Sequence, residues 1–385
     1  MDRFLDSKPW KKVDWWLLLS TLGLCLVGFI AITFATSSPY TGGDGSLINK
    51  IASLEFGTTI RQFLWFAAGF VAMVALALAD YRSLKDISKW IYIVNAGILL
   101  ALFGLATVTR RTVSWYRFGS IGFQPSEFCK ISLILFLGKI LCDHVRAEDG
   151  IDNYPDVMKP LVTMGIVFVL VMLQPDMGTA MVYLCTCLGM MLVVGVKWKI
   201  VGGLGALAGG MLPIMWFFVL DDRQRARIYS VFNQDADLLG QGYNVNYSKM
   251  AIGSGGFSGK GMFAEGAMNQ LDWVPEKHTD FIFSAIGEAF GFVGCMVVIL
   301  LYVVLIWRII YIGMNAQNRF GCLICVGVAS MLMAHIFENI AMTMGVMPVT
   351  GIPLPFISYG GSNMLTNMMA IGLVMSVKMR IRRQY

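Results

Sequence analysis

Acidic and imidazole groups gather at the polar end of the stretch LDWVPEKHTDFIFSAIGEAFG (271–291), where a long apolar run begins. Glu276, His278 and Asp280 precede the run, and Glu288 lies about two helical turns beyond Asp280. Carboxyl and imidazole groups transfer protons, and their pKa values are adjusted by burial and by neighbouring charges. An aspartate at a helix start most often caps the helix. The accumulation seen here points instead to acid–base chemistry.

Two further motifs place charges at the ends of apolar runs. In FQPSEFCK (123–130), Glu127 and Lys130 are three residues apart and share one helix face. They form either an internal ion pair or a contact with a ligand headgroup. In LQPDMGTA (173–180), Asp176 either caps the next helix by accepting backbone N–H bonds or contacts a substrate directly.

The glycine-rich segment AIGSGGFSGKG (251–261) resembles a nucleotide-binding P-loop only superficially. Ser254 stands where the first glycine of that motif belongs, and Gly261 replaces its final Ser or Thr. We therefore exclude a nucleotide cofactor. The glycines allow two interpretations, a turn that holds an anion together with Lys260 or a flexible hinge.

The segment VTGIPLPFISYGGSNMLTN (349–367) predicts a rigid, non-helical turn, because it contains two prolines and a glycine pair before the last apolar run. Polar residues also occur inside the apolar run before it, namely His335, Glu338 and Asn339. Polar side chains inside a membrane need partners, so we interpret most of these as donors and acceptors in helix–helix hydrogen bonds.

The elements that position these groups are membrane helices. Of the 385 residues, 57% are hydrophobic and only 14% are charged, against about 25% charged in ordinary soluble domains. In hydrocarbon the backbone must satisfy its own hydrogen bonds, so long apolar runs are expected to be helices. Ten spans are predicted, over approximately 15–34, 62–79, 90–107, 127–145, 160–173, 179–196, 201–220, 281–310, 320–345 and 362–377.

The distribution of Lys and Arg predicts the orientation. Placing both termini in the cytoplasm puts most of the basic residues in the inner segments. The remaining basic residues cluster before the fourth span and in a large extracellular loop, 221–280, between the seventh and eighth spans. Such clusters either attract an anionic ligand at the outer face or are ordinary charge in a long loop. The whole chain, 1–385, is predicted to be a single polytopic membrane domain.

The cysteines and the net charge exclude two classes of function. The eight cysteines lie in or beside apolar runs, with no nearby histidines at metal-ligand spacing. The net charge of +6 reflects basic residues flanking membrane spans and does not indicate a nucleic-acid partner.

Taken together, the motifs resemble one family. LGQGYN (239–244), AIGSGGFSGKG, PEKHTDFIFSAIGE (275–288) and PVTGIPLPFISYGGS (348–362) are similar to segments of the SEDS proteins, the family of RodA, FtsW and SpoVE. FQPSEFCK and QPDMGTA are similar as well, so the resemblance covers nearly the whole chain in order. DWWLLL near Asp14 and the short N-terminal tail favour the RodA branch, which acts in cell elongation.

The resemblance implies an all-α integral membrane protein with ten transmembrane helices and the SEDS fold, in the bacterial plasma membrane. It implies a peptidoglycan glycosyltransferase that polymerises lipid II into glycan linked to undecaprenyl pyrophosphate. Members of the family usually act with a class B penicillin-binding protein. The proposed catalytic aspartate of the family matches Asp280. Two departures stand out. Ser114-Trp115 replaces the family's Arg-Trp, leaving Arg111 or Arg117 as the substitute, and Glu288-Ala289 replaces a paired Glu-Glu.

These considerations give a mechanistic hypothesis. Asp280 deprotonates an acceptor hydroxyl, which attacks the anomeric carbon of the donor with inversion. The charge of the leaving pyrophosphate is offset either by outer Arg and Lys residues or by a divalent cation, Mg²⁺ or Mn²⁺, whose ligands the sequence does not identify. A lipid II flippase and a scaffold for a transpeptidase remain the alternative functions. The expected substrate-contacting residues are Arg111, Trp115, Arg117, Glu127, Lys130, Asp176, Lys260, Glu276, His278, Glu288 and Ser358.

Overall fold

The computed structural model describes residues 12–37, 54–105, 115–118, 121–144, 151, 154–214, 216–217, 224–225, 229, 241–264, 267 and 276–381. Within these ranges the chain is mostly helical. The helices are α1 (Trp15–Thr36), α3 (Gly57–Leu78), α4 (Tyr81–Leu105), α5 (Pro125–His144), α6 (Tyr154–Met172), α7 (Met177–Val194), α8 (Trp198–Ile214), α10 (Gln241–Gly255), α11 (Ile282–Met314), α12 (Arg319–Thr343) and α13 (Gly361–Met379).

Every predicted span overlaps one of these helices, the seventh only as far as Ile214, where α8 ends. In the described part of the chain, seven helices are long and apolar enough to cross a membrane: α1, α3, α4, α6, α7, α11 and α12. The predicted starts at 90 and 160 are too late, since α4 begins at Tyr81 and α6 at Tyr154. Charged residues such as Lys85 and Asp156 extend these helices beyond their apolar segments, where hydropathy gives no signal.

The long eighth span is not one continuous helix. Gly291 has φ 63° and ψ −158°, which interrupts the helical backbone inside α11 and separates 282–290 from 292–314. Only glycine adopts such a conformation readily. The break lies three residues after Glu288 and matters for the site described below.

Two elements were not predicted. The helix α10 lies within the segment expected to be a large loop, and a two-stranded hairpin precedes α5. In this hairpin β1 (Tyr116–Phe118) pairs antiparallel with β2 (Ile121–Phe123), with Arg117 opposite Gly122. Neither element has a strong apolar pattern, so their formation depends on packing against the bundle.

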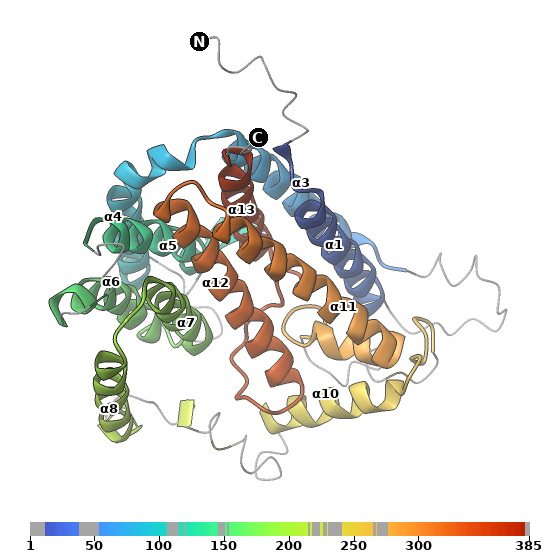
Figure 1. The fold of residues 1–385 in the computed structure, drawn as a ribbon. Helices are drawn as coiled ribbons and strands as arrows, with labels where there is room; N and C mark the ends of the chain where they lie inside the picture. The colour runs from blue at the N-terminus through green and yellow to red at the C-terminus, as the bar shows by residue number, and fades with distance from the viewer. Residues whose placement is uncertain are drawn as a thin grey trace.

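The helices α11, α12 and α13 form the middle of the bundle (Figure 1). α13 packs along α3, α11 packs against α1 and α10, and α12 packs against α7, α5 and α11. The α12–α13 connection, residues 344–360, therefore lies where several helices from both halves of the chain meet. This connection contains the rigid turn predicted from its prolines and glycines.

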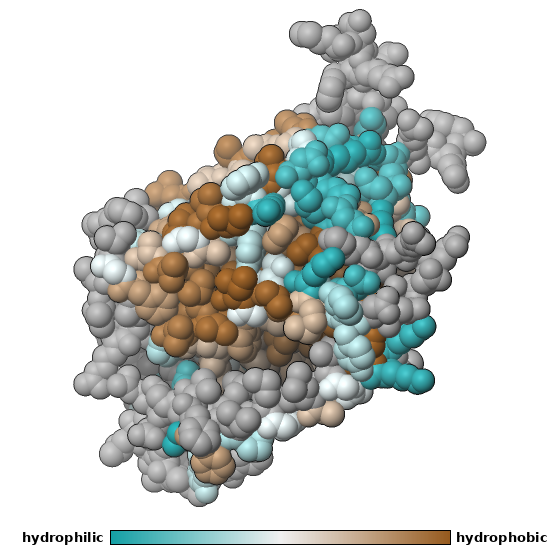
Figure 2. Space-filling model, turned by 90° about the vertical axis from the view of Figure 1, so that its left-hand side faces the viewer, coloured by the Kyte–Doolittle hydropathy of each residue, from teal (hydrophilic) through white to brown (hydrophobic). Residues whose placement is uncertain are grey.

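The surface of the bundle is apolar over much of its side. Figure 2 shows one such face, on which hydrophobic side chains gather in a broad patch and hydrophilic residues lie toward one end. Large exposed apolar residues occur on α4 and α6, among them Trp90, Val94, Leu100, Val162 and Val169. Exposed apolar area on this scale is expected for helices that face lipid.

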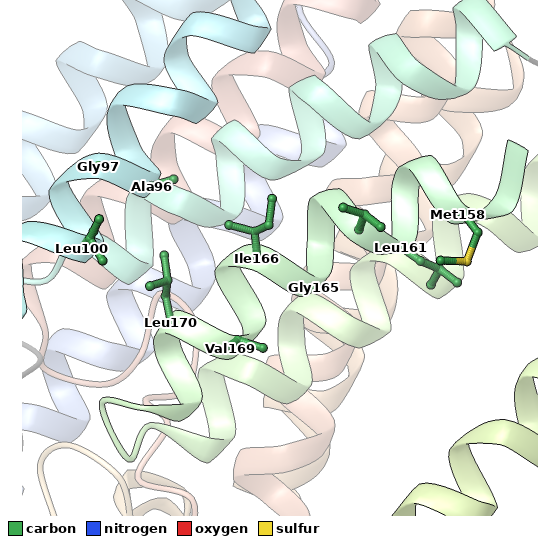
Figure 3. Close-up of a pocket in the computed structure, with 10 residues that line it drawn as sticks. Ala96, Gly97, Leu100, Met158, Leu161, Gly165, Ile166, Val169 and Leu170 are labelled. Carbon is green, nitrogen blue, oxygen red and sulfur yellow. The ribbon is translucent and has the colours of Figure 1, made fainter. Parts of the chain in front are cut away.

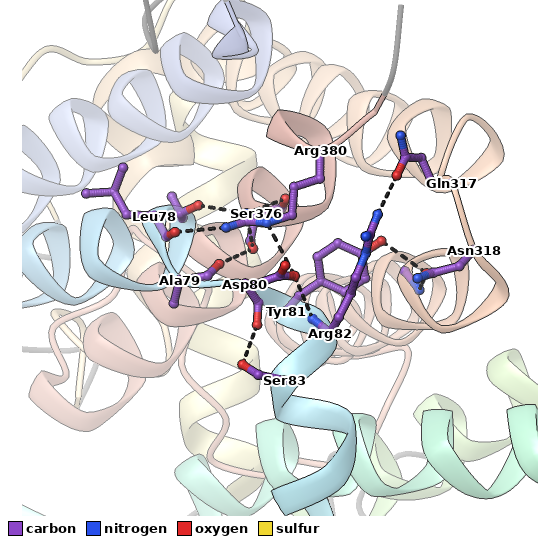
Figure 4. A network of polar contacts seen from close by, with 12 residues as sticks. Leu78, Ala79, Asp80, Tyr81, Arg82, Ser83, Gln317, Asn318, Ser376 and Arg380 are labelled. Atoms are coloured by element: carbon purple, nitrogen blue, oxygen red, sulfur yellow. Dashed lines mark hydrogen bonds and ion pairs between the residues drawn. The ribbon is translucent and has the colours of Figure 1, made fainter. Parts of the chain in front are cut away.

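Ion pairs and hydrogen bonds close the end of the bundle where α1 begins and α13 ends. Asp14 caps α1 and pairs with Arg308 of α11 at 2.5 Å. In the network of Figure 4, Arg380 Nε lies 3.3 Å from Asp80 Oδ1, and Tyr81 donates to Asn318 at 3.1 Å. This end joins α1, α3, α4, α11, α12 and α13, and the turns 276–281 and 344–360 lie at the opposite end.

Candidate active site

Asp280 lies in the turn 276–281 that leads into α11. A hydrogen bond to its backbone carbonyl helps to hold it there. The side-chain amide of Asn339, on α12, donates to the Asp280 carbonyl at 2.8 Å and to the Ile352 carbonyl at 2.7 Å. Asn339 is fully buried, whereas Asp280 is only half-buried. A single amide group thus joins the turn before α11 to the turn after α12.

Ser358 joins the same two turns. Its hydroxyl donates to the Thr279 carbonyl at 2.5 Å and accepts the Leu354 N–H at 2.8 Å. The Tyr359 N–H donates to the His278 carbonyl at 2.9 Å, and the His278 and Tyr359 rings lie 5.9 Å apart. Ser358, expected to contact substrate, therefore has a positioning role in this structure.

The backbone of Gly351 lies close to the Asp280 carboxylate, with no side chain of residue 351 between them. A Cβ atom at this glycine would lie 3.5 Å from Asp280 Oδ2, and its φ of 74° is in the left-handed region. The backbone conformation favours glycine here, while the 3.5 Å separation shows how near the 350–352 backbone lies to the carboxylate. Sequence reasoning did not single out Gly351.

The start of α7 packs against the same turn. A Cβ at Gly178 would lie 2.5 Å from the Ile352 side chain, so the two segments can approach only because residue 178 is glycine. Asp176 caps α7, accepting the Thr179 N–H at 3.1 Å, which confirms the capping interpretation. Its other oxygen accepts from Gln124 at 3.3 Å. Burial raises the pKa of the Asp176 carboxyl above its ordinary value.

Glu127 and Lys130 form the internal ion pair that was one of the two alternatives. Lys130 Nζ lies 2.8 Å from Glu127 Oε2 and 2.8 Å from His335 Nε2, and both charged side chains are almost fully buried. Asn363 donates to the same Glu127 oxygen at 3.2 Å. The pair therefore lies in a polar core between α5, α12 and α13, where each charge depends on the other.

The glycine-rich turn closes the break in α11. The N–H groups of Lys260 and Gly261 donate to the carbonyls of Glu288 and Ala289, each at 2.9 Å. A Cβ at Gly259 would lie 2.2 Å from the Ala289 oxygen, so this approach requires glycine. These two N–H groups therefore donate to carbonyl oxygens and not to an anion. The glycine-rich turn acts as a clamp that holds the end of α10 against residues 288–289 of α11.

The side chains of this clamp pair as well. Lys260 Nζ lies 3.1 Å from Glu288 Oε1, with Glu288 buried and Lys260 about one-third exposed. Two residues expected to contact substrate are thus joined to each other, and their common role in the structure is to fasten α10 to α11.

The remaining predicted residues lie near the hairpin or in the turn. Trp115 is half-buried and packs on Gly122, where an added Cβ would lie 3.0 Å from its ring. Arg111 is outside the described residues, and for Arg117 only the backbone is described. The hairpin reaches the site through Gln124, whose N–H donates to Ser362 at 3.1 Å.

Glu276 and His278 belong to the turn itself. Glu276 has a positive φ of 52°, and its side chain accepts from the Thr279 hydroxyl at 3.2 Å. Burial lowers the pKa of His278 below its ordinary value, and Lys277 lowers it further, while Glu276 opposes both. These groups therefore shape the turn that presents Asp280.

One positioning residue was missed by the sequence analysis. Gln62, fully buried on α3, donates to the Ser358 carbonyl at 3.2 Å and accepts the Gly360 N–H at 3.1 Å. A lone amide in an apolar helix was the available signal, since such a group needs partners.

The described residues contain no cluster of side chains of the kind that commonly binds a divalent cation. Across those ranges, no three His, Cys, Asp or Glu side chains are placed to hold a metal ion together. We assign no step of the reaction to the cation considered above.

Comparison with known proteins places this arrangement in a family. A sequence model described as "Cell cycle protein" (FTSW_RODA_SPOVE) matches residues 15–383. Peptidoglycan glycosyltransferase MrdB from Escherichia coli (strain K12) is 35% identical over 327 residues, covering 84% of this chain and 86% of that protein.

Solved structures share the fold. A chain from "Structural coordination of polymerization and crosslinking by a peptidoglycan synthase complex" has a TM-score of 0.77 and 26% identity, covering 97% of this chain and 99% of its own. The crystal structure of the rod shape determining protein RodA from Thermus thermophilus has a TM-score of 0.68 and 25% identity, covering 98% of this chain and 100% of its own.

Proposed function

Because this chain belongs to the FtsW/RodA/SpoVE family of cell cycle proteins, we propose that it is a peptidoglycan glycosyltransferase that polymerises lipid II. The relative MrdB carries that enzyme name and aligns over 84% of this chain. The observation that carries the proposal is the position of Asp280, a half-buried carboxylate fixed between two turns that are tied together by Asn339 and Ser358.

In the proposed reaction, Asp280 accepts the proton of the acceptor sugar hydroxyl. The hydroxyl oxygen then attacks the anomeric carbon of the donor, the bond to pyrophosphate breaks, and the configuration inverts. Arg111 or Arg117, in the segment before α5, supplies positive charge to the leaving pyrophosphate. The chain's own contribution is the placement of the base, since Asn339 ties the Asp280 backbone to that of Ile352, next to Gly351.

We further propose that the site faces the outside of the bacterial plasma membrane, with both termini in the cytoplasm. The start of α1 and the end of α13 lie at one end of the bundle, where Lys378 is 3.9 Å from Asp14. The site lies at the other end. A class B penicillin-binding protein is the proposed partner, supported by the likeness to a chain of a peptidoglycan synthase complex.

The test is polymerisation of purified lipid II by the Asp280→Asn variant in vesicles. The ties to Asn339, Ser358 and Tyr359 run through main-chain atoms of 278–280, so this variant should fold. Loss of a positioned base lowers the rate by about 10²–10⁴-fold. The matched control is Asp143→Asn, which removes an exposed carboxylate paired with Lys85 at 2.7 Å, far from the site.

The same assay separates the alternatives. A folded Asp280→Asn variant that polymerises lipid II like the wild type contradicts the assignment of the base. If wild-type protein moves lipid II across vesicles without polymerising it, the flippase function replaces the enzyme. Support of a partner transpeptidase by Asp280→Asn to the wild-type level would favour a scaffold.

A further inference from the structure

A groove of about 800 Å³ lies between α4 and α6, on the apolar side of the bundle (Figure 3). Its lining consists of hydrophobic side chains and glycines, among them Ala96, Gly97 and Leu100 from α4 and Met158, Gly165 and Leu170 from α6. None of the residues assigned above to the reaction lines it.

Two glycines keep the groove open. Gly97 on one wall and Gly165 on the other have no heavy atom within 4 Å of the position that a Cβ would occupy. Glycine weakens a helix interior relative to alanine, and no close helix contact requires it at either position. The open space in front of both glycines therefore belongs to the groove.

Hydrogen bonds close the groove on the side that faces the bundle. Behind it, the Tyr92 hydroxyl donates to the Thr163 carbonyl at 2.6 Å, and the Gln174 amide donates to the Leu99 carbonyl at 3.1 Å. Single side chains therefore bridge the two walls at two levels. A single extended hydrocarbon chain can lie between these walls, over the floor that the two bridges form.

The groove is also longer than one leaflet. From Met158 to Leu170 its wall on α6 rises by about 18 Å at about 1.5 Å per residue. Half of a hydrocarbon core of about 30 Å is about 15 Å. An acyl chain of a phospholipid ends near the middle of the bilayer, whereas a polyprenyl chain extends further.

One end of the groove leads toward the candidate active site. Leu170 lies one to two turns before Asp176, which bonds to Gln124 at the start of α5. Gly178 then contacts the turn at Ile352, next to the glycine that faces Asp280. A lipid anchored in the groove would therefore carry its headgroup into the region of the proposed chemistry.

We propose that the α4–α6 groove binds the polyprenyl chain of the pyrophosphate-linked substrate, an inference that rests on the proposed function. The groove sets the position of the headgroup through the tail. It also makes the enzyme sensitive to the length of that tail, because a short chain does not reach the part lined by Met158 and Leu161.

Binding is tested without catalysis. A polyprenyl phosphate with a photoreactive diazirine near its tail end is incorporated into phospholipid vesicles with the full-length protein. The wild type should be labelled on α4 and α6. Gly97→Leu and Gly165→Leu fill the groove from opposite walls and should each reduce this labelling about tenfold, since each buried methylene contributes to chain binding.

The control is Gly104→Leu, on the same helix as Gly97, with no atom within 4 Å of its added Cβ and outside the groove lining. It should label like the wild type. If one filling variant fails to fold, the other carries the test from the opposite wall. The proposal is overturned by labelling on other helices, by labelling that both filling variants retain, or by equal labelling from a photoreactive phospholipid that polyprenyl phosphate does not displace.

A kinetic measurement distinguishes this proposal from the proposed function. With lipid II carrying a full-length or a shortened polyprenyl chain, the wild type should show a lower KM for the longer chain. Gly165→Leu should raise that KM about tenfold, and it should leave unchanged the KM for a chain shortened so far that it does not reach Gly165. If no lipid is polymerised by the wild type, the proposed function fails, while the labelling still decides the groove. Equal KM values for both chains in the wild type overturn the groove assignment.

Discussion

Asn339 holds Asp280 through the main chain, with its amide nitrogen 2.8 Å from the Asp280 carbonyl and 2.7 Å from that of Ile352. Helix α12 thereby fixes the distance between the turn that carries the carboxylate and the turn that carries Gly351. The Asp280 carboxylate, the proposed base, takes no part in these bonds. Its position can therefore be disturbed without altering its chemistry.

Replacing Asn339 by alanine should reduce activity through position alone. Two buried carbonyls lose their donor, which costs about 1–3 kcal/mol of stability, and kcat for polymerisation should fall about ten- to a hundredfold as the base moves. The measurement is kcat and KM with lipid II, together with the melting temperature. Asn315→Ala is the matched control, because the Asn315 side-chain amide donates to the Tyr311 carbonyl at the end of α11 that lies away from the site. Wild-type kcat in a folded Asn339→Ala variant would contradict the positioning role.

The buried pair of Glu127 and Lys130 should show strong coupling. Lys130→Met leaves a carboxylate buried without its ion partner, which costs about 3–5 kcal/mol. The double variant Glu127→Gln/Lys130→Met removes both charges and should recover much of that loss. Unfolding of the wild type, both single variants and the double variant in one detergent gives the coupling energy. Additive effects of the two substitutions would show that the charges act independently.

The helices could be predicted from sequence because hydropathy is a local property. In the described part of the chain, each of the ten apolar runs overlaps a helix, and the errors lie at charged ends such as those of α4 and α6. The helix α10 was missed for the same reason, since its polar sequence, QGYNVNYSKMAIGSG, gains its stability from packing against α11.

The roles of individual polar residues were harder to predict. A lysine in a glycine-rich turn suggests an anion site, yet Lys260 pairs with Glu288, 28 residues away. Most polar residues of the ninth span were expected to bond to other helices. Asn339 instead donates to carbonyls of two turns at the end of the bundle, where the backbone is neither helix nor strand. The identity of a partner depends on tertiary packing, so the sequence predicts only that one is needed.

The glycine clamp on α11 should tolerate substitutions unequally. Gly259→Ala would place a Cβ 2.2 Å from the Ala289 oxygen, whereas a Cβ at Gly256 meets nothing within 4 Å. Both glycines have positive φ, so Gly256→Ala measures the backbone strain alone, about 1–2 kcal/mol. Gly259→Ala should cost clearly more and should expose Lys260 to trypsin. Thermal unfolding and limited proteolysis of the two variants provide the comparison, and equal losses would mean that the clamp does not require this close approach.

His278 should make the protein less stable in mild acid. Its pKa in the folded protein lies below the ordinary value of 6.5 because the ring is partly buried, and Lys277 adds to this shift while Glu276 opposes it. The unfolded chain therefore binds a proton near pH 6.5 that the folded chain binds only at lower pH. The free energy of unfolding should accordingly fall as the pH drops below about 6.5, with a slope of at most one proton for this group. His278→Gln stays neutral, so its melting temperature should change less than that of the wild type between pH 7.5 and 5.5. A pH dependence that is unchanged in His278→Gln would assign the acid sensitivity to another group.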